Sequence, residues 1–333
     1  MIIYTGNPFD ELRRQAAGRR VAVVTDSNVA PLLSATGYDT IVISAGEENK
    51  TLATVGEVWN RMVDLRLRRG DVVACIGGGV VTDLGGFCAA TFKRGLSCIN
   101  VPTTILGAVD AAVGGKTGFD FRGLKNEIGA FSMPEAVIVS DIFYATLPRR
   151  ERLSGYGEML KHALLDSPAA FARFTEMTPD EVRLDDIRRS VALKERIVAA
   201  DPREGGLRRI LNLGHTVGHA LEELLLEKGT PESHGACVAR GIVAELANSR
   251  INAGLDSTVL YAAATLVRPY YGPMPATCGD YPRLLELMAR DKKNRRADLL
   301  TLVELSAPGH ATVADCPLAD ATAMLDLAAD LLS

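Results

Sequence analysis

Short, continuously apolar runs rich in β-branched residues alternate with helical patterns through the first 150 residues, and this alternation restricts the fold most. The runs lack the apolar–polar alternation of a one-sided sheet, so they are typical of parallel strands covered on both faces. Such an alternation predicts an α/β domain with ligands at the carboxyl ends of its strands. The predicted strands are 20–25, 40–44, 71–76, 97–101 and 136–140, with a helix over 52–67.

The second half of the chain has a different pattern, because the strand signal nearly disappears from about residue 151. Helices are predicted over 155–165, 186–200, 211–227, 234–253, 257–267, 281–290 and 318–332, with one late hairpin formed by 299–305 and 311–314. A length of 333 residues suits two domains. We therefore predict an α/β, Rossmann-like nucleotide-binding domain over residues 1–150 and an all-α domain over residues 151–333.

The net charge, the distribution of apolar residues and the cysteine pattern exclude several classes of protein. The formal net charge is −4, from 37 basic and 41 acidic residues, so no basic excess points to nucleic acid. No run approaches 18 apolar residues, and charges interrupt the first 25 residues, which argues against a membrane span and a signal peptide. The six cysteines form no CxxC pair. We expect a cytoplasmic enzyme that binds neither nucleic acid nor membrane.

Two glycine-rich segments could hold anionic groups. Gly77-Gly78-Gly79-Val80 follows a predicted strand and precedes a helix expected near Asp83, which suits a pyrophosphate or, alternatively, only a tight turn. Residues 110–117 (DAAVGGKT) differ from a P-loop because an aspartate replaces its first glycine and would face the phosphates. This second segment is better explained as a substrate-binding loop.

The histidines indicate a metal site without choosing its ligands. His215 and His219 lie four residues apart on one helix face, a spacing that can chelate zinc. His234 opens the next predicted helix, and Glu158 precedes Lys161 by one helical turn. The alternative is a pair of polar helix residues that never meet a metal.

Several motifs occur along residues 20–305 in the order in which a known family carries them. Together they resemble the 3-dehydroquinate synthases of the sugar-phosphate cyclase superfamily. The matching segments are 46–50, 77–83, 92–95, 101–104, 109–117, 125–126, 157–161, 204–208, 212–219, 234–235 and 291–293.

The resemblance implies two cofactors. Zinc, with cobalt as a substitute, would be held by Glu158, His215 and His234, which leaves His219 as a phosphate-binding and proton-handling residue. NAD would contact Asp26, Asn28, Glu47, Lys50, Gly78, Gly79, Val80, Asp83, Thr103, Thr104, Lys125, Thr146 and Leu147.

The resemblance also implies a substrate with a phosphate at one end and a carboxylate at the other, which suits lysine and arginine side chains. The phosphate end would meet Lys116, Asn126, Lys161 and His219, and the carboxylate end would meet Lys194, Arg208, Asn212 and one of Lys292 and Lys293. Asp110 and Glu204 complete the polar set. Arg94, expected at the end of a helix, would reach into the partner's site of a homodimer.

The implied reaction converts 3-deoxy-D-arabino-heptulosonate 7-phosphate to 3-dehydroquinate and phosphate in the shikimate pathway. NAD oxidises the C5 alcohol and later returns the hydride, so it acts catalytically. An aminodehydroquinate synthase is the first alternative, because it would keep the same residues. Another sugar-phosphate cyclase of secondary metabolism is also an alternative, although such relatives generally alter the 114–117 loop or the carboxylate-binding positions. A metal-dependent polyol dehydrogenase is a weaker one, because a polyol needs no anion-binding lysines.

Three features depart from the family pattern. Thr82 replaces a usual glycine, the segment 29–40 is short, and Leu124 replaces the glycine before Lys125. The first two predict a less enclosed adenosine half of NAD and therefore weaker NAD binding.

Overall fold

The computed structural model describes residues 1–34, 36–290, 294, 296 and 298–333. The chain forms two compact units. The first contains Met1–Pro148 and Arg183–Glu195, and the second contains Arg149–Val182 and Arg196–Ser333. The sequence placed residues 183–195 with the later helices, whereas their contacts in the structure are with the first unit.

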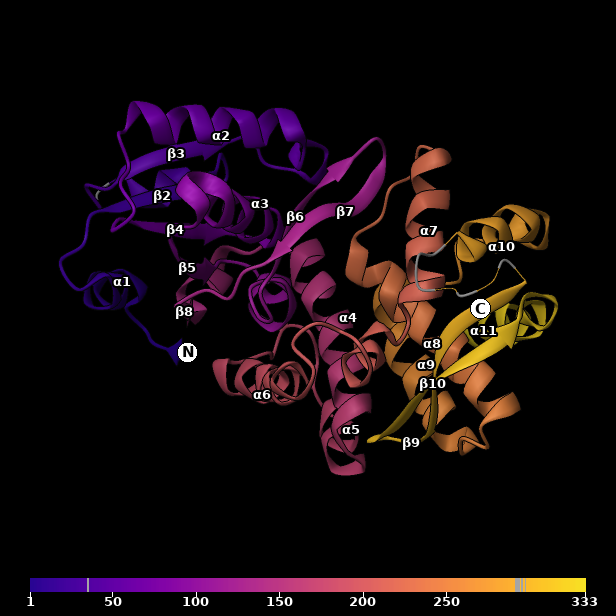
Figure 1. Ribbon diagram of the computed structural model, residues 1–333. Coiled ribbons are helices and arrows are strands. Elements are labelled where there is room, and N and C mark those ends of the chain that lie inside the picture. The colour runs from indigo at the N-terminus through magenta and orange to yellow at the C-terminus, as the bar shows by residue number, and fades with distance from the viewer. Residues whose placement is uncertain (35, 291–293, 295, 297) are drawn as a thin grey trace. The chain divides into compact units, whose positions relative to one another are not determined.

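A six-stranded parallel sheet in the order β1-β8-β5-β4-β2-β3 forms the centre of the first unit (Figure 1). All five strands expected from the apolar runs are present, with ends shifted by at most one residue. The strands are β1 (Ile2–Tyr4), β2 (Val21–Asp26), β3 (Asp39–Ile43), β4 (Val72–Gly77), β5 (Ser97–Pro102) and β8 (Ala136–Val139). The prediction of a Rossmann-like α/β fold is confirmed.

Helices cover both faces of the sheet (Figure 1). Helices α2 (Leu52–Asp64) and α3 (Gly79–Thr91) lie on one face, and α1 (Pro8–Ala16) lies on the other (Figure 1). Buried residues such as Val55, Val58 and Met62 of α2 and Leu84 of α3 pack with the sheet in one apolar core. Removing this apolar surface from water at about 25 cal/mol per Å² is what holds the layers together. Helix α3 begins at Gly79, four residues before the expected start near Asp83.

A two-stranded antiparallel hairpin begins within the glycine-rich segment 110–117 and was not expected from the sequence. It consists of β6 (Lys116–Phe121) and β7 (Leu124–Phe131), preceded by a π-helical turn, η4 (Gly107–Ala111). Nearly every residue of β7 is exposed. Because neither face of β7 is buried, its sequence shows no apolar–polar alternation with a period of two, and the strand is therefore not predictable from the sequence.

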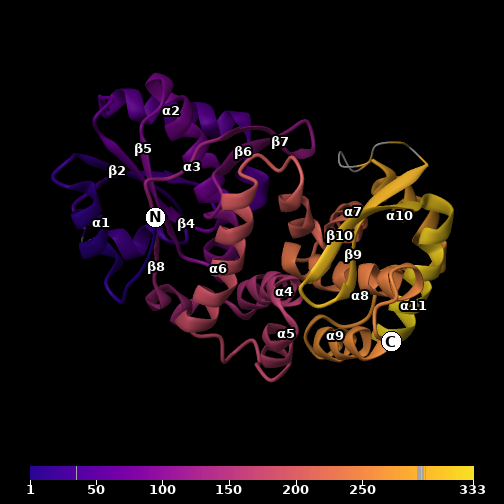
Figure 2. The same cartoon turned by 60° about the horizontal axis from the view of Figure 1, so that its bottom comes forward.

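The second unit is mainly helical. Its helices are α4 (Arg149–Asp166), α5 (Pro168–Thr175), the last turn of α6 (Leu184–Ala200), α7 (His215–Glu227), α8 (His234–Asn252), α9 (Ser257–Tyr271), α10 (Tyr281–Ala289) and α11 (Ala321–Leu332). Helix α8 is the central one, because α4, α7, α9, α11 and strand β9 all contact it (Figure 2). The predicted start of α7 at residue 211 is wrong. Residues 207–212 form a separate short helix, η6 (Leu207–Asn212), and Gly214, with a left-handed φ of 79°, separates it from α7, which begins at His215.

The predicted late hairpin is present as β9 (Leu299–Ala307) and β10 (His310–Pro317). The six cysteines are all free thiols, and five of them are buried. Within the described ranges, no helix has both the length and the apolar character that a membrane crossing requires.

Candidate functional site

Glycines placed next to two candidate metal ligands allow helices α4 and α8 of the second unit to approach closely. A Cβ on Gly157 would lie 2.3 Å from the carbonyl oxygen of Gly235, and a Cβ on Gly235 would lie 1.9 Å from the carbonyl oxygen of Ser154. These two glycines are therefore required where α4 crosses α8. Glu158 follows the first glycine and His234 precedes the second, so the close crossing brings the two ligand candidates together.

The carboxylate of Glu158 lies at the centre of this crossing and is fully buried. Its Oε1 is 3.4 Å from Nε2 of His215 and 3.4 Å from Nε2 of His234. Its Oε2 forms an ion pair with Nζ of Lys161, which is also buried. One carboxylate oxygen is thus directed at two imidazoles while the other is held by an ammonium group.

This arrangement fits a divalent metal ion. A tetrahedral zinc ion with Zn–O and Zn–N bonds of ~2.1 Å separates its ligand atoms by ~3.4 Å, which is the separation found between Glu158 Oε1 and both imidazole nitrogens. Carboxylate and imidazole are also the donors that zinc and cobalt accept. Three protein ligands leave a coordination position open for a substrate oxygen, as in catalytic zinc sites.

Outer partners orient both imidazoles. Nδ1 of His215 lies 3.1 Å from the carbonyl oxygen of Leu213, and Nδ1 of His234 lies 3.3 Å from Oε2 of Glu222. An imidazole that donates from Nδ1 presents its Nε2 lone pair to a metal. Burial alone lowers the pKa of His234, but hydrogen bonds to Glu158 and Glu222 raise it to about 10. The same two carboxylates that favour a proton on His234 favour a metal cation in its place.

His219 lies on the next turn of α7 and is exposed, unlike His215. Its ring centroid is 5.2 Å from that of His215 and 5.6 Å from that of His234. Ligand atoms of all three histidines come within 4.8 Å of one another. The geometry therefore groups His219 with the other two, and the choice of Glu158 over His219 as third ligand stays a prediction.

In the first unit, the expected NAD contacts collect at the carboxyl edge of the sheet. Asp26 ends β2, Gly78 follows β4, and Thr103 follows β5, so parallel neighbours place all three at one edge. Gly78 is the N-cap of α3 and supplies no capping side chain, which leaves the first amides of this helix to a ligand. An anionic pyrophosphate suits such a helix end.

Lys50 connects two of the predicted sites. Its Nζ donates to Oδ2 of Asp83 and to Oδ1 of Asn126, each at 2.6 Å, and it lies 3.9 Å from Oε1 of Glu47. Burial by itself lowers the pKa of Lys50, but the neighbouring carboxylates, Asp83 foremost, hold it above its usual value. Burial raises the pKa of Asp83 despite the lysine. A residue expected on NAD is thus bonded to one expected on the substrate.

The other expected NAD residues surround this edge in the first unit. Asp26 Oδ1 accepts from the backbone amides of Asn28 and Val29 at 2.9 and 3.0 Å, and Thr104 Oγ1 accepts from the amide of Gly107 at 2.9 Å. The remaining ones are Gly79 and Val80 in the first turn of α3, Lys125 in β7, and Thr146 and Leu147 at the end of η5 (Asp141–Thr146). Between β2 and β3, in the segment that the sequence shows to be short, the described residues form one short 3₁₀ helix, η1 (Ala30–Leu33).

The segment 110–117 is not a P-loop in the structure. Lys116 opens strand β6, whereas a P-loop lysine stands at the start of a helix. Asp110 lies in η4, and both its backbone oxygen and its Oδ1 accept from Nζ of Lys194 at 2.5 Å. The structure therefore brings together two residues that the resemblance assigned to the substrate, from segments more than 80 residues apart.

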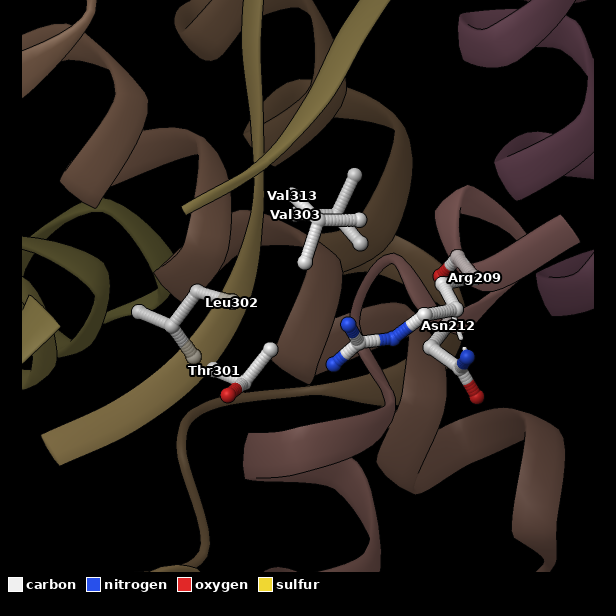
Figure 3. Close-up of a pocket in the computed structure, with 6 residues that line it drawn as sticks. All are labelled: Arg209, Asn212, Thr301, Leu302, Val303 and Val313. Atoms are coloured by element: carbon white, nitrogen blue, oxygen red, sulfur yellow. Dashed lines mark hydrogen bonds between the residues drawn. The ribbon is translucent and has the colours of Figure 1, made fainter. Parts of the chain in front are cut away.

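The segment around η6 carries the second unit's expected carboxylate-binding residues. Asn212 Nδ2 donates to Oε1 of Glu204 and to the carbonyl oxygen of Arg209, each at 3.0 Å. Arg208 is buried, and its Nη1 donates to the carbonyl oxygen of Pro202 at 2.8 Å. Figure 3 shows the Arg209 side chain extending toward β9 beside a cavity of about 10 Å³, room for about one water molecule.

Three expected site residues have left-handed backbone conformations that side chains rarely adopt. They are Arg94 with φ 66°, Asn126 with φ 51° and Glu204 with φ 59°. Backbone strain of this kind costs about 1–3 kcal/mol per residue and is concentrated at functional sites. Helix α3 ends at Thr91, and Arg94 is the last residue of the short 3₁₀ helix that follows it, η3 (Phe92–Arg94), at an exposed position before Gly95.

Lys292 and Lys293, one of which the resemblance assigned to the substrate carboxylate, lie outside the described residues. Two further functional candidates were not predicted from the sequence. Glu222, which orients His234, was missed because its place three residues after His219 gives no sign that it faces another helix. Glu245, fully buried in α8, was missed for the same reason.

Comparison with protein families assigns the chain. Residues 40–154 match the model for the 3-dehydroquinate synthase N-terminal region, and residues 155–294 match the model for the C-terminal region. The chain belongs to the 3-dehydroquinate synthase family. The 3-dehydroquinate synthase of Parabacteroides distasonis is 43% identical over 258 residues, covering 76% of this chain and 73% of that protein. The 3-dehydroquinate synthase of Latilactobacillus sakei is 35% identical, covering 95% of this chain and 91% of that protein.

Several solved structures share the fold of this chain. A 2-deoxy-scyllo-inosose synthase complexed with carbaglucose-6-phosphate, NAD+ and Co2+ has a TM-score of 0.84 at 19% identity, covering 99% of this chain and 96% of that one. A 2-epi-5-epi-valiolone synthase from Streptomyces hygroscopicus with NAD+ and Zn2+ bound has the same score at 24% identity, with the same coverage. A probable glycerol dehydrogenase from Sinorhizobium meliloti reaches 0.65 at 17%, covering 100% of this chain and 97% of that one. The predicted family is confirmed.

Proposed function

We propose that this chain is a 3-dehydroquinate synthase that converts 3-deoxy-D-arabino-heptulosonate 7-phosphate to 3-dehydroquinate and inorganic phosphate, in the shikimate pathway. The observation that carries the proposal is the carboxylate of Glu158 at 3.4 Å from both His215 and His234, in a chain that matches both family models. That cluster has the donors and spacing of an open metal site.

Zn2+ or Co2+ and NAD are the proposed cofactors, since the solved cyclases named above hold them. When bound, the metal polarises the C5 oxygen of the substrate and NAD exchanges the C5 hydride. Lys161 holds Oε2 of Glu158 by an ion pair, which keeps Oε1 directed at the metal position. Glu222 and the Leu213 carbonyl keep the ligand imidazoles in the tautomer that binds metal.

The substrate's anionic ends are assigned to cationic and amide groups. For the phosphate we propose Lys116, Asn126, Lys161 and Arg94, with the His219 imidazole exchanging a proton with a phosphate oxygen during elimination. For the carboxylate we propose Lys194, Arg208 and Asn212. Asp110 and Glu204 hold Lys194 and Asn212 in the structure, so we assign them positioning roles.

The assay that tests this function measures phosphate release from 3-deoxy-D-arabino-heptulosonate 7-phosphate by the metal-loaded protein with trace NAD. We expect many phosphate ions per NAD and one carbocycle per phosphate, because the hydride returns to the product. Stoichiometric accumulation of NADH with glycerol or another polyol, and no phosphate release, would instead establish a polyol dehydrogenase. Faster turnover of the amino analogue of the substrate would establish an aminodehydroquinate synthase.

We also propose a homodimer in which Arg94 acts on the partner's phosphate site. The support is the exposed turn formed by Lys93, Arg94 and Gly95, whose φ values are 50°, 66° and 119°. A guanidinium in such a turn suits bidentate contact with a phosphate. Mixing Arg94→Ala with Lys116→Ala subunits should restore part of the activity, because one site of each heterodimer is intact. No recovery after proven subunit exchange would contradict the role in trans.

A further inference from the structure

The start of α7 lacks the capping side chain that a helix normally has. Its N-cap residue is Gly214, and no side chain at that position accepts a hydrogen bond from the first turn. Glycine is required because a Cβ would lie 2.5 Å from Cγ1 of Ile242 and 2.8 Å from the carbonyl oxygen of Val238 in α8. The close crossing of α7 and α8 therefore excludes Ser, Thr, Asp and Asn from the N-cap position.

A carboxylate from the neighbouring helix occupies this role. Oε1 of Glu245, in α8, accepts from the backbone amide of Thr216 at 3.2 Å, and its Oε2 faces the amide of Val303 in β9 at 3.4 Å. The side chain is fully buried. Thr216 is the second residue of α7, so its amide is one of the donors that the helix itself leaves unsatisfied. A negative charge at this end also interacts favourably with the helix dipole.

The position of the capped amide relates the carboxylate to the metal site. Thr216 directly follows His215, whose Nε2 lies 3.4 Å from Oε1 of Glu158. Glu245 lies on the same helix as His234. One side chain thus links the helix that carries one imidazole ligand to the first turn that carries the other.

We propose that Glu245 is a positioning residue that caps α7 from α8 and thereby fixes His215 at the metal site; the inference rests on the proposed function. Glu245 touches neither metal nor substrate in this role. Its loss lets the first turn of α7 shift, which changes the distance between His215 and Glu158 and weakens metal binding.

Ser249 offers a matched control. It lies one turn after Glu245 on α8, and its Oγ accepts from the amide of Leu305 in β9 at 3.1 Å. The two side chains therefore anchor alternate residues of the same strand, but among the described residues Ser249 makes no hydrogen bond to α7. Ser249→Ala removes this helix–strand hydrogen bond and the bond that Ser249 Oγ donates to the backbone carbonyl oxygen of Glu245, and it leaves the carboxylate that caps α7 in place.

The test compares Glu245→Gln, Glu245→Ala and Ser249→Ala with the unaltered protein, using Co2+ titration, the visible spectrum of bound Co2+ and thermal unfolding. We expect Glu245→Gln to weaken Co2+ binding about 10-fold, as outer-shell substitutions do, Glu245→Ala to weaken it further, and both to change the Co2+ spectrum. Ser249→Ala should lower the melting temperature with unchanged Co2+ affinity and spectrum. Equal effects of Glu245→Gln and Ser249→Ala on Co2+ affinity would overturn the inference.

Two further outcomes are distinguishable. If the unaltered protein binds no Co2+, both the proposed metal site and this inference fail. If the Glu245 variants do not fold, hydrogen exchange of the unaltered protein decides: the amide of Thr216 should exchange as slowly as amides in the middle of α7, and fast exchange would overturn the cap.

Discussion

Gly235→Ala places a methyl group where α4 and α8 cross. The added Cβ would lie 1.9 Å from the carbonyl oxygen of Ser154, and Cβ atoms in proteins essentially never approach another atom within 3.0 Å. The two helices must therefore separate by about 1 Å at this point. Overpacking of this kind costs about 1–3 kcal/mol of unfolding free energy.

The same separation acts on the metal site, because His234 precedes Gly235 and Glu158 lies on the opposing helix. Their 3.4 Å contact would lengthen by about the same amount, beyond the ~3.4 Å ligand separation around a tetrahedral zinc ion. Substitutions that disturb the groups orienting a metal ligand cost about 10- to 100-fold in metal affinity, and Gly235→Ala displaces the ligand itself. We therefore expect metal affinity to fall by about 100-fold.

The assay is calorimetric titration of the metal-free protein with Zn2+, together with denaturant unfolding of each sample. Gly56→Ala is the matched control, because Gly56 also lies in a helix, α2, and a Cβ there meets nothing within 4 Å. It should raise stability by about 0.5–1 kcal/mol and leave metal affinity unchanged. A folded Gly235→Ala protein with undiminished Zn2+ affinity would refute the reasoning.

Three other perturbations test separate parts of the structure. Glu222→Gln removes the carboxylate behind one ligand imidazole, so Zn2+ affinity should fall about 10- to 100-fold in the same titration; an unchanged affinity would contradict this. Lys50→Met leaves the partly exposed carboxylate of Asp83 without the ammonium group 2.6 Å away, so the free energy of unfolding should fall, by less than the ~3–5 kcal/mol of a fully buried pair. Adding Asp83→Asn should restore part of this loss. A double variant no more stable than Lys50→Met would argue against a stabilising ion pair. An ion pair with Lys228 and hydrogen bonds from Thr277 lower the pKa of Asp280 to about 2, so its contribution is present above pH ~4 and is lost as pH falls from there toward 2. Asp280→Asn should therefore flatten the pH dependence of stability over that range, measured by urea unfolding, and an unchanged slope would contradict the low pKa.

Elements with a buried face were predictable from the sequence. Strands β2, β4 and β5 are continuous apolar runs because both of their faces are covered, and a run of that kind has few other stable environments. Hairpin β6–β7 was not predictable, because its exposed strand carries no alternation. The segment 183–195 was assigned with the later helices because helical periodicity shows which face is apolar but not which core it joins.

The sequence predicts only those parts of the candidate site whose residues lie close together along the chain. Spacing suggested His215 with His219, and only the resemblance replaced His219 by Glu158 and His234. The structure supplies the physical reason for considering that set, since glycines at the helix crossings bring Glu158 and both imidazoles within 3.4 Å. Glu245 faces the start of another helix, and no local pattern contains that information.

Metal content is the measurement that tests the central claim most directly. Glu158→Ala, His215→Ala, His219→Ala and His234→Ala would each be purified, saturated with Zn2+, dialysed and analysed for bound metal and for phosphate release. We predict that His219→Ala retains one Zn2+ per chain and loses turnover, while the other three lose both. A His219→Ala protein without metal, beside a Glu158→Ala protein that keeps it, would contradict the proposed ligand set.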